Sequence, residues 1–222
     1  VISVLGCDIF ATEQDAASRI EKLMTDYERD ERFSGAVLAA EGDSLIFEGA
    51  FGLANREWKI PNTLDTRFRI ASISKPFTQI LVLQQVEDGT LKLDDVIADH
   101  IPEYSGPGAD VITVEQLLTH RSGIVGERAV RDLDDIERHY YTRERLLEYI
   151  AGYDLWFEPG SRLGYSNFGY SVLAVILERA SGQSYADLLK TGICEPAGMK
   201  DTIVDLTSDI MDRRAAGYHF LT

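Results

Sequence analysis

The sequence predicts an α/β (α+β) protein, in which an antiparallel sheet flanked by helices is followed by a helical subdomain. Three observations favour this class. The strand-forming patterns lie in the first third of the chain, and helical patterns fill most of the remainder. The composition is that of a globular protein, with 45% hydrophobic and 27% charged residues among 222. A chain of this length can form one large domain or two small ones.

The first 71 residues are expected to form the N-terminal helix and the strands of the α/β part. A helical pattern runs from about 15 to 27. The stretch FSGAVLAAEGDSLIFEGAFGLAN then predicts two strands around a turn at 41–43, where a Gly-Asp pair supplies the turn chemistry. TRFRIA, at 66–71, is a candidate for a short third strand.

Residues 72–200 are expected to form a long helix and a helical subdomain. The long helix spans 72–88, because Gly89 follows in the position where a left-handed residue ends a helix. Three more helices are predicted from start and stop signals: one that opens at Thr113 and stops at Gly123, one from about 168 to 180 that ends at Gly182, and one near 184–191.

The number of convincing strands is low for a protein with a sheet. A two-stranded ribbon is marginal alone, and sheets usually contain more strands. Residues 201–222 are interpreted as a return segment toward C-terminal strands that the sequence lacks. We therefore expect an N-terminal portion of a longer protein, or a protein whose remaining part is disordered, cleaved or on another chain, with self-association or a second chain completing the sheet.

The composition argues against several kinds of partner. A net charge of -15 disfavours nucleic acid, because phosphate binding needs clustered Lys and Arg. No metal site or disulfide framework is expected, since Cys7 and Cys194 are far apart and the four histidines are scattered. No apolar run reaches the length of a membrane span. The compartment stays open: VLGC, near the N-terminus, is either the end of a lipoprotein signal or a short apolar strand or leader remnant.

The stretch RIASISKPFTQ, at 69–79, carries Ser72 and Lys75 three residues apart, so that both side chains project from one face of the helix start. A serine hydroxyl becomes a strong nucleophile when a neighbouring base takes its proton. A lysine can be that base if burial and the positive end of the helix dipole favour its neutral form. By itself this pattern is weak, because a capping serine beside a solvated lysine explains most isolated matches.

The stretch GYSNFGY, at 164–170, precedes the strongest apolar helix. One interpretation is that Ser166 or Asn167 caps this helix and Tyr165 packs against it. The other gives Tyr165 a phenol that transfers protons and Asn167 an amide that binds a substrate. The stretch alone does not decide between the two.

Three stretches occur in one order along the chain: FRIASISKPFT, LLTHRSGI and FEPGSRLGYSNFGY. Together they resemble the serine β-lactamase and penicillin-binding-protein-like superfamily, most closely its class C-like branch, which includes esterases and D-aminopeptidases. The resemblance covers the chain from about residue 15 onward, and P-G-x-x-x-x-Y-S-N-x-G-Y is its most specific part. It implies a β-lactamase/transpeptidase-like fold and a serine hydrolase that forms an acyl-enzyme without metal or cofactor.

The resemblance also implies a role for each matched residue. Ser72 would be the acylated nucleophile, Lys75 its proton partner and Tyr165 the shared general base and acid. Asn167 would orient the substrate, and the backbone N–H of Ser72 would form half of an oxyanion hole, a donor typically worth ~3 kcal/mol of barrier. The turn at 120–123 would belong to the scaffold. Whether Lys75 or Tyr165 deprotonates Ser72 stays open.

The third motif of the family, Lys-Thr-Gly or His-x-Gly on a strand that lines the site, has no usable counterpart. KTG does occur at 190–192, but at the end of a short helix only about 25 residues after Tyr165. We interpret it as a lysine beside a helix-terminating glycine and reject Lys190 as a site residue. The second oxyanion donor is therefore expected to lie outside this sequence.

Other functions remain open on the sequence alone. An α/β-hydrolase needs G-x-S-x-G, and GYSNF fails at its last position. A non-catalytic relative that binds a ligand or assembles, or an inactive fragment of a longer hydrolase, would retain the same motifs. The expected substrate is a small molecule or a peptide, and the sequence does not separate an ester, a D-peptide and a β-lactam.

Overall fold

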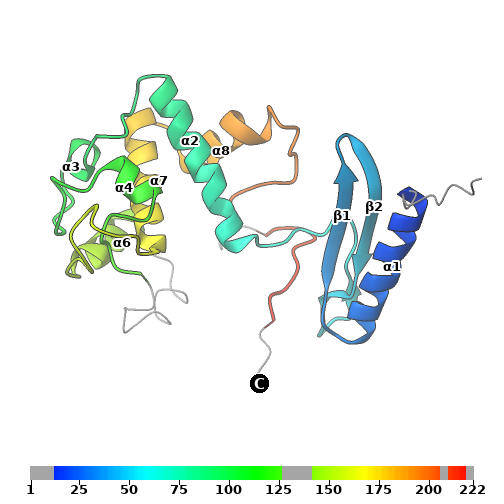
Figure 1. The fold of residues 1–222 in the computed structure, drawn as a ribbon. Helices are drawn as coiled ribbons and strands as arrows, with labels where there is room; N and C mark the ends of the chain where they lie inside the picture. Colours follow the sequence, from blue (N-terminus) through cyan, green and yellow to red (C-terminus); the bar gives the residue numbers. More distant parts are fainter. Residues whose placement is uncertain (1–12, 127–141, 206–209, 219–222) are drawn as a thin grey trace, which may run out of the picture. The chain divides into compact units, whose positions relative to one another are not determined.

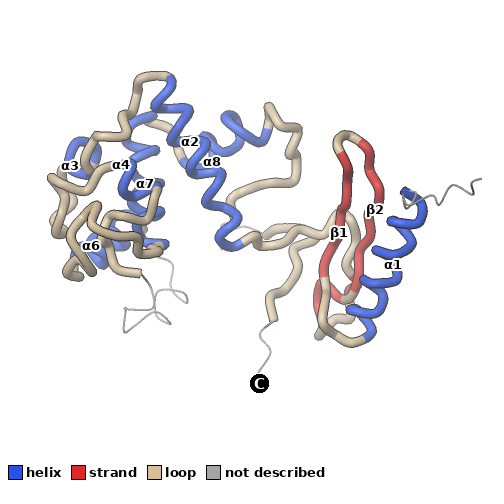
Figure 2. Tube along the Cα trace, viewed as in Figure 1, coloured by secondary structure: helices blue, strands red, loops and turns tan. Residues whose placement is uncertain are grey.

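The computed structural model describes residues 13–126, 142–205 and 210–218 (Figure 1). The chain divides into two compact units, one of Val1–Arg69 with Asp209–Thr222 and the other of Ile70–Ser208. Figure 2 shows that the strands of the described residues lie in the first unit, whereas the second is built from helices and loops. The division after residues 71 and 200 that the sequence suggested stays a prediction.

The first unit contains, among its described residues, one helix and four strands: α1 (Glu13–Arg29), β1 (Gly35–Glu41), β2 (Ser44–Phe51), β3 (Leu53–Asn55) and β4 (Ile60–Pro61). The β1 and β2 strands form an antiparallel hairpin, and α1 packs against β2. Gly42, at φ 57°, occupies the turn between them, where a residue without Cβ adopts the left-handed region at no steric cost. The predicted first helix and first two strands are confirmed.

The third strand predicted at 66–71 is wrong. Arg67 forms only an isolated parallel bridge with Arg214. A turn closes at Thr66, whose N–H donates to the Thr63 carbonyl at 3.1 Å, and a helical segment begins at Ala71. This single bridge is not a ladder of consecutive pairs, so no strand forms here.

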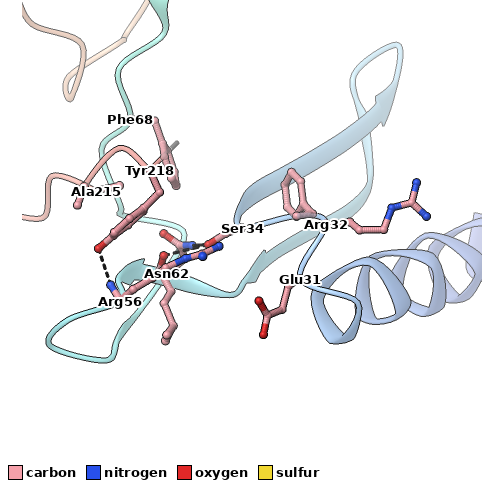
Figure 3. Close-up of a pocket in the computed structure, with 11 residues that line it drawn as sticks. Glu31, Arg32, Ser34, Arg56, Asn62, Phe68, Ala215 and Tyr218 are labelled. Atoms are coloured by element: carbon pink, nitrogen blue, oxygen red, sulfur yellow. Dashed lines mark hydrogen bonds between the residues drawn. The ribbon is translucent and has the colours of Figure 1, made fainter. Parts of the chain in front are cut away.

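Residues 210–218 return to the first unit and help to line a pocket there (Figure 3). The Tyr218 hydroxyl accepts a hydrogen bond from the backbone N–H of Arg56 at 2.6 Å. On the same wall, the buried Asn62 amide donates to Ser34 Oγ at 3.0 Å and to the Phe51 carbonyl at 2.8 Å. No candidate site residue from the sequence lines this pocket.

The described part of the second unit contains η1 (Ala71–Ser74), α2 (Lys75–Glu87), α3 (Ile97–His100), α4 (Val114–Leu118), α6 (Arg143–Ala151), α7 (Asn167–Ser181), α8 (Tyr185–Leu189) and the π-helical η3 (Lys190–Cys194). Its core surrounds α7, which packs against α2, α3, α4, α6 and α8. Val172, Leu173, Ile176 and Leu177 of α7 are fully buried, so this helix is apolar around most of its circumference.

The long helix and the apolar helix of this unit are confirmed. The 3-10 turn η1 runs directly into α2, and Gly89 follows the helix at φ 73°. The Ser166 hydroxyl caps α7 by accepting from the Gly169 N–H at 3.0 Å, and Gly182 ends it in the left-handed conformation. The short helix near 184–191 is confirmed as α8.

Two predicted helix ends are wrong. Thr113 caps α4 as expected, but α4 ends at Leu118, not Gly123, because His120 has φ 56° and cannot continue a right-handed helix. Gly192 does not terminate a helix either, since the π-helical turn continues to Cys194. A Cβ at Gly192 would lie 3.1 Å from Leu81 Cδ2 of α2, so the missing side chain allows close packing.

Candidate active site

Ser72 lies in η1, immediately before α2. The preceding residue, Ala71, has φ 46°, in the left-handed region that residues with a Cβ rarely adopt. Ser74 Oγ donates to the Ala71 carbonyl at 2.7 Å and thereby stabilises the turn. Ser72 is exposed, so its hydroxyl is accessible from the surface of the described residues.

Lys75 is the first residue of α2, one turn after Ser72. Its Nζ lies 3.2 Å from Ser72 Oγ, to which it donates, and also donates to Asn167 Oδ1 at the start of α7. The side chain is half-buried. The ammonium also lies 4.8 Å from the ring centroid of Tyr165 and 5.3 Å from that of Tyr170, within cation–π distance of both.

Tyr165 places a second titratable group beside the Ser72 hydroxyl. Its phenol oxygen lies 2.7 Å from Ser72 Oγ, at hydrogen-bond distance, and either oxygen can donate. The side chain is 47% exposed, which agrees with contact to a ligand better than with simple packing. Ser72, Lys75, Tyr165 and Asn167 are therefore brought together as the sequence predicted, all within the second unit.

His120 also lies at this site, although the sequence suggested only a scaffold turn for 120–123. Its ring centroid is 4.5 Å from that of Tyr165 and 5.0 Å from that of Tyr170. Nδ1 accepts a hydrogen bond from the Ser166 N–H at 3.2 Å. Burial and the nearby charge of Lys75 lower the pKa of His120 below its usual value of about 6.5.

Tyr170 and Gln79 form a support behind the site that sequence reasoning missed. The Tyr170 hydroxyl donates to the Leu118 carbonyl at 2.9 Å and accepts from Gln79 Nε2 at 2.8 Å. Burial raises the pKa of Tyr170 above its usual value. The repeated aromatic in GYSNFGY was the only sequence signal for this residue, and it did not distinguish a core tyrosine from one at the site.

Other residues that the sequence singled out lie elsewhere or outside the described residues. Lys190 is exposed, and its Nζ lies 3.8 Å from a Glu195 carboxylate oxygen. Cys194 is a buried free thiol, whereas Cys7 and the VLGC stretch fall among residues that are not described. In the described part of the chain, no group of three or more His, Cys, Asp or Glu is arranged to bind a metal ion. None of the helices described there is long and apolar enough to cross a membrane.

A family model described as Beta-lactamase matches residues 17–220 of the chain. Penicillin-binding protein 4* of Bacillus subtilis (strain 168) is 36% identical over 214 residues, covering 93% of this chain and 46% of that protein. Esterase EstB of Burkholderia gladioli is 34% identical over 235 residues, covering 98% of this chain and 59% of that protein. The chain thus spans about half the length of these curated relatives.

Solved structures that align with the chain include a hydrolase and an amidase. EstCE1, described as a hydrolase with promiscuous acyltransferase activity, aligns with a TM-score of 0.81 at 26% identity, covering 95% of this chain and 58% of that one. The D-amino acid amidase of Ochrobactrum anthropi SV3, complexed with L-phenylalanine amide, aligns with a TM-score of 0.76 at 29% identity. That alignment covers 95% of this chain and 59% of the amidase, so the fold described above corresponds to somewhat more than half of each solved chain.

Proposed function

The chain belongs to the beta-lactamase family, with the β-lactamase/transpeptidase-like fold that the sequence predicted, and from this premise we propose that it acts as a serine hydrolase. One observation carries the proposal. Ser72 Oγ has two groups able to exchange protons at hydrogen-bond distance, the amine of Lys75 at 3.2 Å and the phenol of Tyr165 at 2.7 Å. An alcohol flanked in this way is arranged for nucleophilic attack.

In the proposed cycle, Ser72 Oγ attacks a substrate carbonyl while its proton passes to Lys75 or Tyr165. The new O–C bond gives a tetrahedral oxyanion, which collapses to an acyl-enzyme as the leaving group departs with a proton from the same pair. Water then attacks the acyl carbon and gives a proton to the same pair, which returns it to Ser72 Oγ as the bond between that oxygen and the acyl carbon breaks and the acid is released. The contacts of Ser72 do not assign the base to one partner, and a coupled pair need not have separate assignments.

The backbone N–H of Ser72 is proposed as one donor to the oxyanion. It lies in the first turn of η1, where helical N–H groups have no partner within the helix. Asn167 is proposed to orient the substrate, because its side chain lies beside Lys75 at the N-terminus of α7.

The proposed substrate is a small molecule or peptide with an activated ester, amide or β-lactam carbonyl. The names of the similar proteins include an esterase, an amidase and a penicillin-binding protein, which together span these three carbonyl classes. Each class requires the same first step at the serine, so the shared chemistry is attack on a carbonyl. Self-association of the chain stays a prediction.

The test is intact-mass measurement after treatment with a fluorophosphonate, with Ser72→Ala and Ser74→Ala as a matched pair in the same turn. We expect one adduct on the chain and on Ser74→Ala, and none on Ser72→Ala. An adduct that persists in Ser72→Ala would exclude Ser72 as the nucleophile. The absence of any adduct would instead favour a non-catalytic relative that binds a ligand or assembles, or an inactive fragment of a longer hydrolase.

A further inference from the structure

His120 makes hydrogen bonds to both residues that flank Tyr165 in the chain. Its carbonyl oxygen accepts from the Gly164 N–H at 2.8 Å, and its Nδ1 accepts from the Ser166 N–H at 3.2 Å. The backbone on either side of Tyr165 is thus attached to one residue. The position of the Tyr165 phenol relative to Ser72 therefore depends on His120.

The imidazole ring adds a third contact to the same tyrosine. It lies against Tyr165 and Tyr170, with ring centroids 4.5 Å and 5.0 Å away and interplanar angles of 35° and 36°. Tyr170 is in turn hydrogen-bonded to the Leu118 carbonyl and to Gln79, so one side of the ring faces a fixed support. The half-buried imidazole therefore contacts both the site tyrosine and this support.

Acceptance of the Ser166 N–H requires an Nδ1 without a proton, so the described contact needs a neutral ring that carries its proton on Nε2. Protonation of Nδ1 would direct its N–H at the Ser166 N–H, so that two donors would face each other without an acceptor. It would also place a second positive charge near Lys75, the cation that already acts on this ring. Among the described residues, the titratable groups that contact the imidazole or act on it are Lys75 of α2, Tyr165, which precedes α7, and Tyr170, on α7.

We propose that neutral His120 is the positioning residue of this site: through Ser166 it keeps the Tyr165 phenol at Ser72 Oγ, and protonation of its imidazole releases that phenol. The functional half of this inference rests on the proposed acylation of Ser72. The geometric half does not depend on acylation. It concerns the tautomer of His120 and the position of the Tyr165 side chain, and both can be observed in the absence of any reaction.

The backbone at His120 offers a matched pair of substitutions. Its φ of 56° is left-handed, and both Asn and Gly adopt that region more readily than other residues. In His120→Asn, Oδ1 can take the place of Nδ1 as an acceptor but cannot be protonated near neutral pH. His120→Gly keeps the backbone and has no acceptor. His100→Asn, which affects a histidine paired with Asp95 at 2.9 Å on another helix, controls for the loss of a histidine.

The first experiment is nuclear magnetic resonance on the uniformly 13C,15N-labelled chain, the His120 signals being identified by their loss in His120→Asn. We expect an unprotonated Nδ1 at pH 8, and we expect the Ser166 amide and Tyr165 ring signals to move together as His120 titrates. A protonated Nδ1 at pH 8, or Tyr165 signals that do not respond to the titration, would overturn the proposal whether or not the chain takes a probe.

The second experiment is the rate of fluorophosphonate labelling at Ser72 between pH 5 and 8. At pH 8 we expect His120→Gly to react about tenfold more slowly than His120→Asn, which is the effect of one hydrogen bond. In the unaltered chain and in His100→Asn, the labelling rate should fall as the pH drops below about 6.5, with the steepness of a single protonation. This fall should be absent in His120→Asn. Equal labelling rates for His120→Asn and His120→Gly at pH 8, or the same fall in rate at acid pH in His120→Asn, would contradict the proposal. A chain that is unlabelled at every pH would refute the proposed function, and the resonance experiment would then decide the role of His120.

Discussion

Ser72 Oγ and the phenol oxygen of Tyr165 lie 2.7 Å apart although 93 positions separate them in the chain. If this phenol carries a proton during acyl transfer, Tyr165→Phe should slow labelling of Ser72 by about 10²–10⁴-fold, the usual contribution of a general acid or base. The fold should be retained, because the side chain is 47% exposed. Labelling rate and circular dichroism measured on the same sample check both expectations.

Tyr185→Phe is the matched control for loss of a tyrosine hydroxyl. The Tyr185 hydroxyl lies 2.8 Å from Thr78 Oγ1, on the same helix that begins with Lys75, and its hydrogen bond is to that threonine rather than to Ser72. Its removal should lower the free energy of unfolding by about 1 kcal/mol and leave the labelling rate unchanged. If both variants lost labelling to the same extent, the effect of Tyr165→Phe would be structural.

Lys75 can serve as a proton acceptor or as a fixed positive charge, and two substitutions separate these roles. Lys75→Met removes both properties and keeps an unbranched chain, whereas Lys75→Arg keeps the charge but cannot give up its proton in a protein. If Lys75 accepts the serine proton, both variants should label at least about 10²-fold more slowly than the unaltered chain. Near-normal labelling of Lys75→Arg would show that the charge is sufficient and would leave proton transfer to Tyr165.

Local patterns were enough to predict α1, α2, α4, α7, α8 and the first hairpin, because their signals lie within each segment, whereas α3 and α6 were not predicted. The Gly-Asp turn and the caps at Thr113 and Ser166 are examples. The prediction of the third strand failed because TRFRIA has strand-forming composition, while only Arg67 bridges another segment, at Arg214, and a helical segment follows at Ala71. Whether a strand forms depends on such neighbours and on a partner, neither of which a single segment contains.

Site residues that belong to a sequence motif could be predicted, whereas residues that contribute only through contacts in the folded chain could not. Ser72, Lys75, Tyr165 and Asn167 were named from two short patterns, and the structure brings all four together. The contribution of His120 was not predicted, because a single histidine in a turn gives no periodic signal. The residues that it contacts lie about 45 positions later in the chain.

Gly123 should be one of the least replaceable glycines of the site scaffold. It has φ 80°, and a Cβ there would lie 2.2 Å from the Phe157 carbonyl oxygen. Gly123→Ala therefore combines a left-handed alanine with a clash against rigid backbone, together about 2–5 kcal/mol of destabilisation. In a domain of this size that corresponds to a fall in Tm of about 5–15 °C.

The control for Gly123→Ala is Gly182→Ala. Gly182 has φ 70° but nothing within 4 Å of the position of a Cβ. The conformational cost alone should lower Tm by about 2–6 °C, since a left-handed alanine costs about 1–2 kcal/mol. Equal falls in Tm for the two variants would mean that the loop around Gly123 moves to accept the methyl group.

Stability should depend on the protonation of His120 in a defined direction. Burial and Lys75 lower the pKa of His120 in the folded chain, so the unfolded chain takes up its proton first, near pH 6.5. The free energy of unfolding should then fall as pH drops from about 6.5 to the lowered pKa, with no further loss from this group below that point. Denaturant titrations of the chain and of His120→Asn at several pH values should show a difference that decreases through this range. A constant difference would contradict a lowered pKa.

Ala71 provides a test of how the backbone presents Ser72. At φ 46° it carries the left-handed penalty of about 1–2 kcal/mol, which a glycine at this position would avoid, although glycine loses about 0.5–1 kcal/mol through the entropy of the unfolded chain. Ala71→Gly should therefore have nearly unchanged stability. It should label about threefold more slowly, because the turn that directs Ser72 toward Lys75 has more conformations available.

Ala71→Val should strain this turn, whereas the glycine variant gives it more conformational freedom. A β-branched residue is a genuine outlier at positive φ, so either the turn is strained and Tm falls by several degrees, or φ changes sign and Ser72 Oγ moves away from Tyr165. Both routes reduce labelling, and Tm separates them: a normal Tm with slow labelling indicates a rearranged turn, whereas a low Tm indicates retained strain. A valine variant with normal Tm and normal labelling would show that the left-handed residue before Ser72 is not required, and the geometry of the nucleophile would then depend on Lys75 and Tyr165 alone.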